Sequence, residues 1–447
     1  MQIKLVIAVC LILCANELIA KDLEQGTFVF AGYTDLTYTD VDNQSRTAYK
    51  FAPIFLIQPS DRFHLEAEFE FAIDDSGESE TEIEYLDLHY FATDTITLTV
   101  GKVLLPFAHF GPHLHPSWIN KLPSQPAIYG GHHGDGLVEG LLPILSDVGI
   151  MYQQVLPFSS KHRLYVDAFV SNGPTSSSLH ADDGHGDQAA HEEASHDDEA
   201  IHDEEEEHHE DGDVEEDHDD EEDHDAGTED EHGDEEGHQD DFADVGHDEY
   251  DSVQYAFAMP ELQFEGKLHD NNSDKAFGGR IGYAYLPGFE AGFSYYRGAY
   301  DDDGNLDFKS EAIDLTYVGR YFTLRGEYIR TATDALGTPI EPTENHLDDE
   351  VDHVDSQVVV PTTSLKRDGW YGQASWQLRS FDHPLLNPIE LVVRHSQVNK
   401  IEEAKRWTFG VNYWWKSSSV FKLSFDRTEL TSGRKVNRIL TQFSHGF

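Results

Sequence analysis

The C-terminal stretch, residues 405–447, alternates between apolar and polar side chains with a period of two. Large apolar residues occupy every odd position at its start: Trp407, Phe409, Val411, Tyr413 and Trp415. The positions between them are small or polar, with Trp414 the exception. After a short turn at 416–419 the alternation resumes and runs to Phe447. Because successive side chains of a strand point to opposite faces, this pattern predicts strands with one apolar and one polar face.

The same alternation recurs along the chain and predicts sixteen strands. The other predicted strands cover residues 27–40, 46–58, 62–73, 82–92, 95–105, 147–157, 162–171, 275–286, 289–297, 310–318, 321–331, 367–379 and 389–398. An even count with alternating short and long connections is typical of single-chain transmembrane barrels. Residues 253–267 are strand-like and unassigned. They either extend the barrel beyond the membrane or add a hairpin and raise the count to eighteen.

Composition favours a transmembrane antiparallel β-barrel over a helical membrane protein. Hydrophobic residues make up 38% of the 447 residues, and no apolar run of about 20 residues follows the N-terminus. A barrel strand needs only about 10 residues, half of them apolar. The alternatives are a soluble β-sandwich and a solenoid. No repeat of fixed period supports a solenoid, and a soluble surface gives no reason for one apolar face on every strand.

The N-terminal residues 1–20 have the plan of a signal peptide. Lys4 precedes an apolar run at 5–15, and cleavage is expected near Ala20. Both cysteines, Cys10 and Cys14, lie inside this segment. The expected mature chain, residues 21–447, is therefore an exported barrel without disulfides.

Two short segments carry a family resemblance. Residues 101–107 read Gly-Lys-Val-Leu-Leu-Pro-Phe, and the last strand ends Gln-Phe-Ser-His-Gly-Phe at 442–447. With the sixteen-strand plan, they make the chain resemble the phosphate-selective porin type of outer-membrane barrel, and more weakly the siderophore-porin family. The resemblance implies a channel in the outer membrane of a Gram-negative bacterium, in contact with lipid and lipopolysaccharide. It also implies insertion by the barrel-assembly machinery and allows a homotrimer.

The third outer connection, residues 106–146, is the expected constriction loop. Its one permanent cation is Lys121, against Asp135 and Glu139. Phosphate selectivity requires fixed positive charge at the constriction, so this balance favours cations or uncharged solutes. The predicted pore-lining residues are Glu66, Glu68, Glu70, Lys121, Arg325 and Arg394.

Residues 180–251 contain 37 Asp and Glu and 12 His, with neither Lys nor Arg. Like charges repel and apolar residues are scattered, so residues 175–252 are predicted to form a disordered extracellular loop. Imidazole with carboxylate suits divalent metals, zinc first. The candidate ligands there are His208, His209, His218 and His224. The alternative is an acidic, solvating brush.

A second histidine cluster lies in the expected constriction loop: His109, His113, His115, His132 and His133. A folded loop could join them in one metal site. The alternative is that these side chains satisfy hydrogen bonds in a compact plug. Spacing alone does not decide between the two.

The sequence thus predicts a channel for passive uptake of small solutes, with a surface loop that concentrates zinc. One alternative is a surface scaffold or adhesin whose acidic loop is a brush. Another is a siderophore- or phosphate-type porin without a metal role. The zincin, nucleophile-elbow and P-loop motifs of enzymes are absent, and no cofactor is expected to be obligatory. The formal charge of −56 disfavours nucleic acid.

Overall fold

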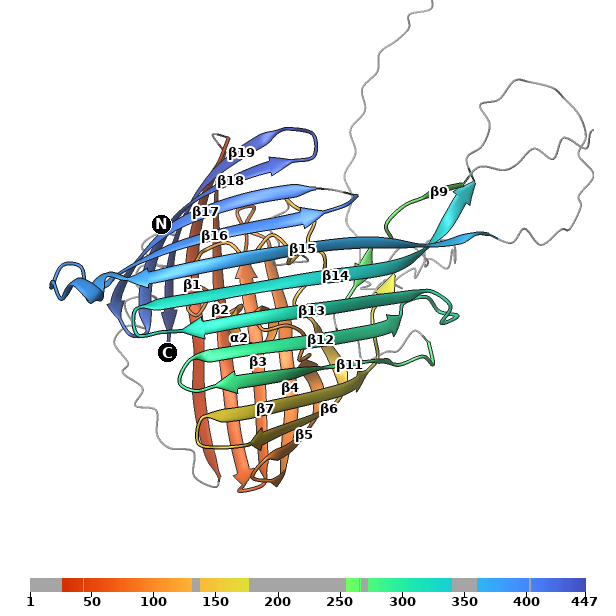
Figure 1. Cartoon of the computed structure of the whole chain (residues 1–447), viewed down its shortest axis with the longest axis horizontal. Helices are drawn as coiled ribbons and strands as arrows, with labels where there is room; N and C mark the ends of the chain where they lie inside the picture. The colour runs from red at the N-terminus through yellow and green to blue at the C-terminus, as the bar shows by residue number, and fades with distance from the viewer. Residues whose placement is uncertain are drawn as a thin grey trace, which may run out of the picture. The chain divides into compact units, whose positions relative to one another are not determined.

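The computed structural model describes residues 26–42, 44–130, 137–176, 255–264, 266, 272–339, 360–401 and 403–447 (Figure 1). The predicted signal peptide, the acidic His-rich stretch 180–251, and the pair His132 and His133 lie outside these ranges. The chain divides into two units, and every strand in the described ranges belongs to the unit made of residues 1–183 and 254–447. None of the helices in the described ranges is long and apolar enough to cross a membrane.

Sixteen long strands form one closed antiparallel sheet. In chain order they are β1 (Thr27–Val41), β2 (Gln44–Ser60), β3 (Phe63–Ile73), β4 (Ser79–Thr93), β5 (Ile96–Leu104), β6 (Ser146–Pro157), β7 (His162–Ser171), β11 (Ala276–Tyr285), β12 (Phe289–Ala299), β13 (Asp307–Val318), β14 (Phe322–Pro339), β15 (Thr362–Gln377), β16 (Ile389–Asn399), β17 (Ala404–Lys416), β18 (Ser419–Leu430) and β19 (Lys435–Gly446). The predicted antiparallel barrel of sixteen strands is therefore confirmed.

The ring closes between the first and last strands. β1 pairs with β19 from Tyr33 opposite Gly446 to Val41 opposite Arg438. Gly32 and Phe447 exchange two backbone hydrogen bonds of 3.0 and 2.9 Å at the end of this seam. A Cβ on Gly32 would lie 2.3 Å from the carbonyl oxygen of Ala52, so the seam requires glycine there. Closure leaves this sheet without the free edges that lipid cannot satisfy.

The unassigned stretch 253–267 extends the sheet and adds no pair of spanning strands. β9 (Tyr255–Phe257) pairs with Gly337–Pro339 at the end of β14. β10 (Leu262–Gln263) pairs with β8 (Thr175–Ser176) beside the ring. The first of the two alternatives for this stretch is correct, and the ring keeps sixteen strands.

The two faces of the wall differ in polarity, as the alternation predicts. Trp407, Phe409 and Val411 point outward and are 44–52% exposed, whereas Arg406 and Thr408 between them are at most 2% exposed. An outward apolar face on every side of a closed ring is the arrangement that hydrocarbon solvates. We conclude that the strands cross a membrane and that their polar faces line the interior.

Some strands extend beyond the apolar segments that predicted them. The strand predicted at 321–331 continues as β14 to Pro339, and β15 begins at Thr362, before its predicted start. Leu336 still pairs with Thr362 there. Apolar alternation marks only the stretch that faces lipid, while backbone pairing continues into water. For the same reason β1 and β2 still pair at Val41 and Gln44, although a long connection between them was predicted.

Candidate pore

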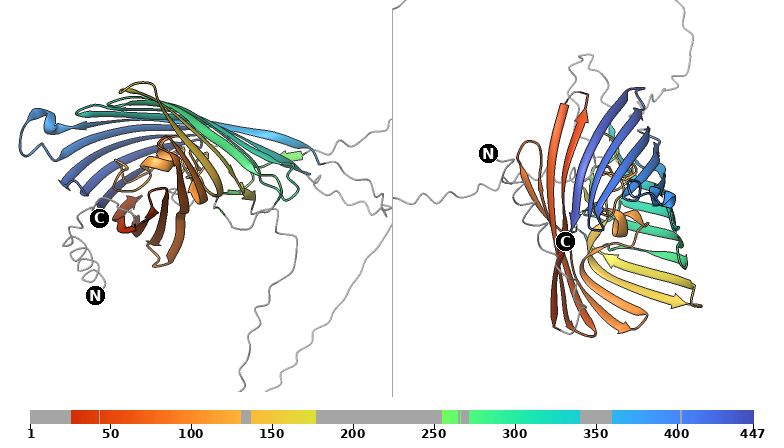
Figure 2. Two further views of the ribbon diagram at one scale, coloured as in Figure 1. Left: turned by 90° about the horizontal axis from the view of Figure 1, so that it is seen from below. Right: turned by 90° about the vertical axis from the view of Figure 1, so that its left-hand side faces the viewer.

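The connection between β5 and β6, residues 105–145, folds inward and carries a short helix, α2 (Phe110–Leu114). Figure 2 shows this helix between strands of opposite sides of the wall. The backbone N–H of Leu105 donates to the carbonyl of Leu145 at 2.9 Å, which closes the base of the loop. We call residues 105–145 the inner loop; the prediction placed a constriction loop at 106–146.

Glu327 of β14 fixes the inner loop at residues 109–110 and at residue 129. Its carboxylate accepts the backbone N–H groups of His109 (3.1 Å) and Phe110 (2.6 Å) on one oxygen. The other oxygen accepts the hydroxyl of Tyr129 at 2.6 Å. Nearby, the N–H of Ala108 donates to Ser294 Oγ at 2.9 Å. One buried carboxylate therefore connects two distant points of the loop to the same strand.

Three cations and one carboxylate fix residues 117–124, between the two points that Glu327 holds. Lys422 of β18 donates through Nζ to the carbonyls of Ser117 and Asn120 (2.7 Å to Asn120), and Arg394 of β16 donates to the carbonyl of Ser124 at 2.7 Å. Lys121 of the loop forms an ion pair with Glu390 of β16. Buried cations thus hold loop carbonyls that would otherwise lack partners.

Apolar packing seals the loop against the same strands. Leu122 lies so close to β17 that a Cβ on Gly410 would come within 2.4 Å of its Cδ2 atom. Likewise, a Cβ on Gly369 of β15 would lie 2.9 Å from Cγ2 of Ile128. Glycine at these two wall positions lets the loop lie flat against the strands. Toward β1–β4 the inner loop leaves free space.

A cavity of about 720 Å³ fills that space. Strands β1–β4, β17 and β19 and the inner loop line it. Its charged lining consists of Asp35, Glu70, Asp74, Asp75, Glu80 and Glu82 against Arg46, Lys50, Arg406 and Arg438. Lys50 pairs with Glu70 at 2.5 Å, and Arg438 pairs with Asp426 at 2.8 Å. Carboxylates outnumber cations in the lining, so the cavity carries a net negative charge.

The six predicted pore-lining residues occupy different places. Glu70 lines the cavity. Lys121 and Arg394 form hydrogen bonds between the loop and the wall. Glu66 contacts His64 Nε2 at 2.8 Å. The remaining two lie within the wall: Glu68 is buried on the inner face of β3, and Arg325 is half-buried on β14.

Sequence reasoning missed nine of the ten charged residues on the cavity wall, two of them on the C-terminal strands. Arg406 precedes Trp407, and Arg438 precedes Ile439, so both occupy the polar phase of an alternation that was recognised. The other seven lie on β1, β2 and β4 or between β3 and β4: Asp35, Arg46, Lys50, Asp74, Asp75, Glu80 and Glu82. Their position in the polar phase of the alternation could have identified Arg406 and Arg438 as facing the interior. The alternation does not show which strand across the lumen each side chain faces.

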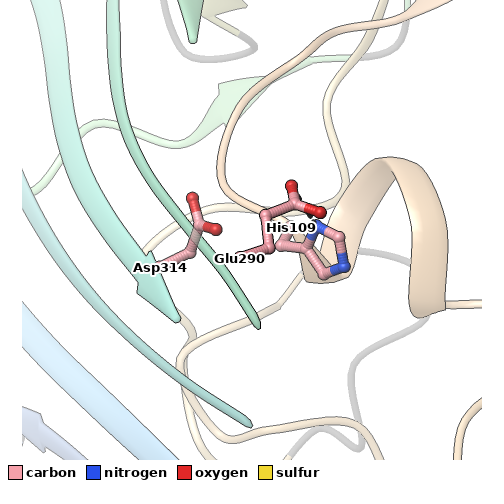
Figure 3. A group of neighbouring side chains, drawn as sticks. All are labelled: His109, Glu290 and Asp314. Atoms are coloured by element: carbon pink, nitrogen blue, oxygen red, sulfur yellow. Dashed lines mark ion pairs between the residues drawn. The ribbon is translucent and has the colours of Figure 1, made fainter. Parts of the chain in front are cut away.

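The loop histidine His109 meets two wall carboxylates, Glu290 of β12 and Asp314 of β13 (Figure 3). The potential ligand atoms of the three residues all lie within 4.8 Å of one another. His113 lies nearby, with its ring tilted by 54° and its centroid 5.0 Å from that of His109. Burial lowers the pKa of both imidazoles to about 4, so both are neutral at neutral pH. These residue types could hold a divalent cation.

Arg280 of β11 already compensates the two carboxylates. Its guanidinium donates to Asp314 at 2.9 and 2.6 Å and to Glu290 at 2.9 Å. A Cβ on Gly292 would lie 2.5 Å from this guanidinium, so glycine makes room for it. A metal ion at His109 would therefore compete with a bidentate ion pair for the same oxygens.

His115 has partners within the loop and the wall. Its Nδ1 donates to the carbonyl of Gly111 at 2.5 Å, and its Nε2 lies 3.7 Å from Glu84 of β4. Burial lowers its pKa to about 4. The structure thus separates His115 from the cluster of His109 and His113. The other predicted ligands lie outside the described residues: His132, His133, His208, His209, His218 and His224.

No family model matches the chain, and no curated protein matches it. Solved structures with a similar fold include an anion-selective porin from Comamonas acidovorans (10% identity over 95% of this chain and 100% of that one, TM-score 0.49). Others are OmpF of Salmonella typhi in complex with daunomycin (9%, 94% and 98%, 0.49) and a loop L8 deletion mutant of OmpT from Vibrio cholerae (11%, 95% and 100%, 0.47). At these identities the likeness concerns the fold alone.

Proposed function

We propose that the chain is a channel of the Gram-negative outer membrane through which small hydrophilic solutes diffuse passively. The observation that carries this proposal is the charged cavity of about 720 Å³ between the inner loop and the wall of a closed barrel. An apolar exterior with an ionised interior is the arrangement of water-filled barrels. Contact with lipid and lipopolysaccharide, insertion by the barrel-assembly machinery and a homotrimeric state are part of the proposal and follow from the resemblance.

The charge of the cavity favours cations and uncharged solutes over phosphate. Six carboxylates line it against four cations. Of those cations, Lys50 and Arg438 are in ion pairs with Glu70 and Asp426. An anion entering this space would be desolvated without a matching excess of fixed positive charge.

The first prediction concerns ion selectivity. In planar bilayers under a potassium chloride gradient, the wild-type channel should show a cation-selective reversal potential. Changing Glu80 and Glu82 together to glutamine should shift that potential toward zero, because both line the cavity. Glu311→Gln is the matched control, since Glu311 lies exposed on the outward phase of β13. An unchanged potential in the double variant would reject the proposed path.

We further propose that residues 180–251 concentrate divalent metal, zinc first, for uptake through this channel. The support is compositional: 12 histidines stand among carboxylates in a stretch without cations. His109 and His113 at the inner loop would be the next candidate ligands, in competition with Arg280.

The second prediction tests this role with the wild type and a variant lacking residues 180–251. Micromolar zinc should change single-channel conductance or selectivity only in the wild type. A zinc response of equal size in both forms would assign the effect to the barrel. No response in either form would leave the acidic stretch as a solvating brush. No conductance in either form would favour the scaffold function.

A further inference from the structure

A second cavity of about 650 Å³ lies on the other side of the inner loop, under residues 137–143. The two cavities share only Leu137 and Val138, so this limb of the loop separates them. Strands β13–β15 and the segment 259–264 complete the second cavity. Its apolar wall is formed chiefly by Leu141, Leu142, Met259, Leu262, Phe264 and Phe308. The rest of the lining includes polar and charged side chains, among them Glu139, Glu261, Thr331, Thr333 and Arg367. An apolar wall with convergent polar groups in a cavity of this size is typical of a small-molecule site.

Arg367 is the one cation among the described residues that line this cavity. Its side chain is only 4% exposed. It donates through one terminal nitrogen to Glu139 Oε1 at 2.9 Å and through the other to the carbonyl of Glu139 at 2.8 Å. Its Nε is buried and has no hydrogen-bond partner among the described residues. The buried guanidinium is thus only partly satisfied.

The counter-ion of Arg367 can be exchanged at small cost. The side chain of Glu139 is 57% exposed, so water can solvate its carboxylate once it leaves. A ligand carboxylate could then bind the Nε edge of the guanidinium, where planar bidentate pairing is favourable. The released Glu139, with the exposed Glu261 on the same cavity, would offer two carboxylates to a cationic group.

We propose that this cavity binds an amphipathic zwitterion: an apolar amino acid or a short apolar peptide. The ligand carboxylate pairs with Arg367, the apolar side chains pack on the leucine and phenylalanine wall, and the ammonium lies toward Glu139 and Glu261. A zwitterion has no net charge to be repelled by a chain of formal charge −56, whereas an amphipathic anion has. Binding does not require conduction, so this site goes beyond the proposed channel and can fail independently of it.

The test is isothermal titration calorimetry of the refolded full chain with the dipeptide leucyl-phenylalanine. We expect saturable binding. N-acetylation or C-terminal amidation of the dipeptide should each weaken it by about tenfold or more, the usual effect of losing a charged hydrogen bond. Arg367→Gln should weaken binding similarly. Arg297→Gln should not, because Arg297 is paired with Asp307 at 2.8 Å and does not line the cavity.

A second variant guards against misfolding of the first. Met259→Trp adds volume to the cavity and leaves the pair of Arg367 and Glu139 intact. It should abolish dipeptide binding while conductance stays at the wild-type value. The proposal is overturned by absence of binding, or by wild-type affinity in either Arg367→Gln or Met259→Trp. Equal affinity for the free and acetylated dipeptides would also overturn it, because the site would then recognise a simple organic anion.

Discussion

Replacing Glu327 with leucine is expected to detach residues 109–110 and 129 of the inner loop from the wall and to enlarge the channel. The carboxylate accepts the N–H groups of His109 and Phe110 and the hydroxyl of Tyr129, all within 3.1 Å. Leucine leaves these three donors without that acceptor. Each unsatisfied buried donor costs about 1–3 kcal/mol, and a folded loop avoids this cost by moving toward water. Single-channel conductance should therefore rise.

The matched control is Glu327→Gln, which keeps the shape and one carbonyl oxygen of the side chain. It should retain the bonds to the two loop N–H groups and stay close to the wild type in conductance. The thermal midpoint of unfolding should fall in the order wild type, Gln, Leu. A leucine variant with wild-type conductance and an intact barrel would show that packing of residues such as Leu122 holds the loop without Glu327.

The barrel could be predicted because its physical cause is local. Apolar and polar residues alternate along each strand, as at Trp407 and Phe409. Lipid outside the barrel and water inside it require the same period of two in every strand. Strand ends are less predictable, because backbone pairing continues past the apolar segment, as between Leu336 and Thr362. There the sequence shows no change of period at the boundary.

The candidate pore could be predicted only in part, because its contacts join distant residues. Lys422 binds Asn120, 302 positions earlier, and no local pattern relates the two. The sequence identified a loop with charged residues and histidines. It did not show which of these residues would bind the loop to the wall. Lys121 and Arg394 have the right charge and phase for a pore, yet both bind at the loop–wall contact.

The histidine cluster likewise shows that the sequence alone does not identify the contacts of a candidate site. His109 has metal-ligand chemistry, and the structure gives it two carboxylate neighbours, Glu290 and Asp314. Only the structure shows that Arg280 already binds the carboxylate oxygens, in the space left by Gly292. Residue type suggests a site; the neighbouring charges decide what can occupy it.

Replacing Lys422 with methionine should loosen residues 117–124 of the inner loop. Lys422 is completely buried, and its ammonium donates to the carbonyls of Ser117 and Asn120 and to Gln442 Oε1. Methionine preserves the length and apolar stem of the side chain but donates no hydrogen bond. Loss of the buried charge also removes its desolvation cost, so the net change in unfolding free energy is small compared with the local effect.

That local effect should be visible as proteolysis in the loop. Trypsin should cleave after Lys121 faster in Lys422→Met than in the wild type, where Lys121 is held against Glu390. Open-channel current noise should increase for the same reason. Lys405→Met is the matched control, because Lys405 lies exposed on β17 and pairs across the strand with Glu429, away from the loop. Equal cleavage rates in all three proteins would mean that Arg394 and the pair of Lys121 and Glu390 suffice to hold residues 117–124, and that Lys422 serves only to neutralise charge inside the wall.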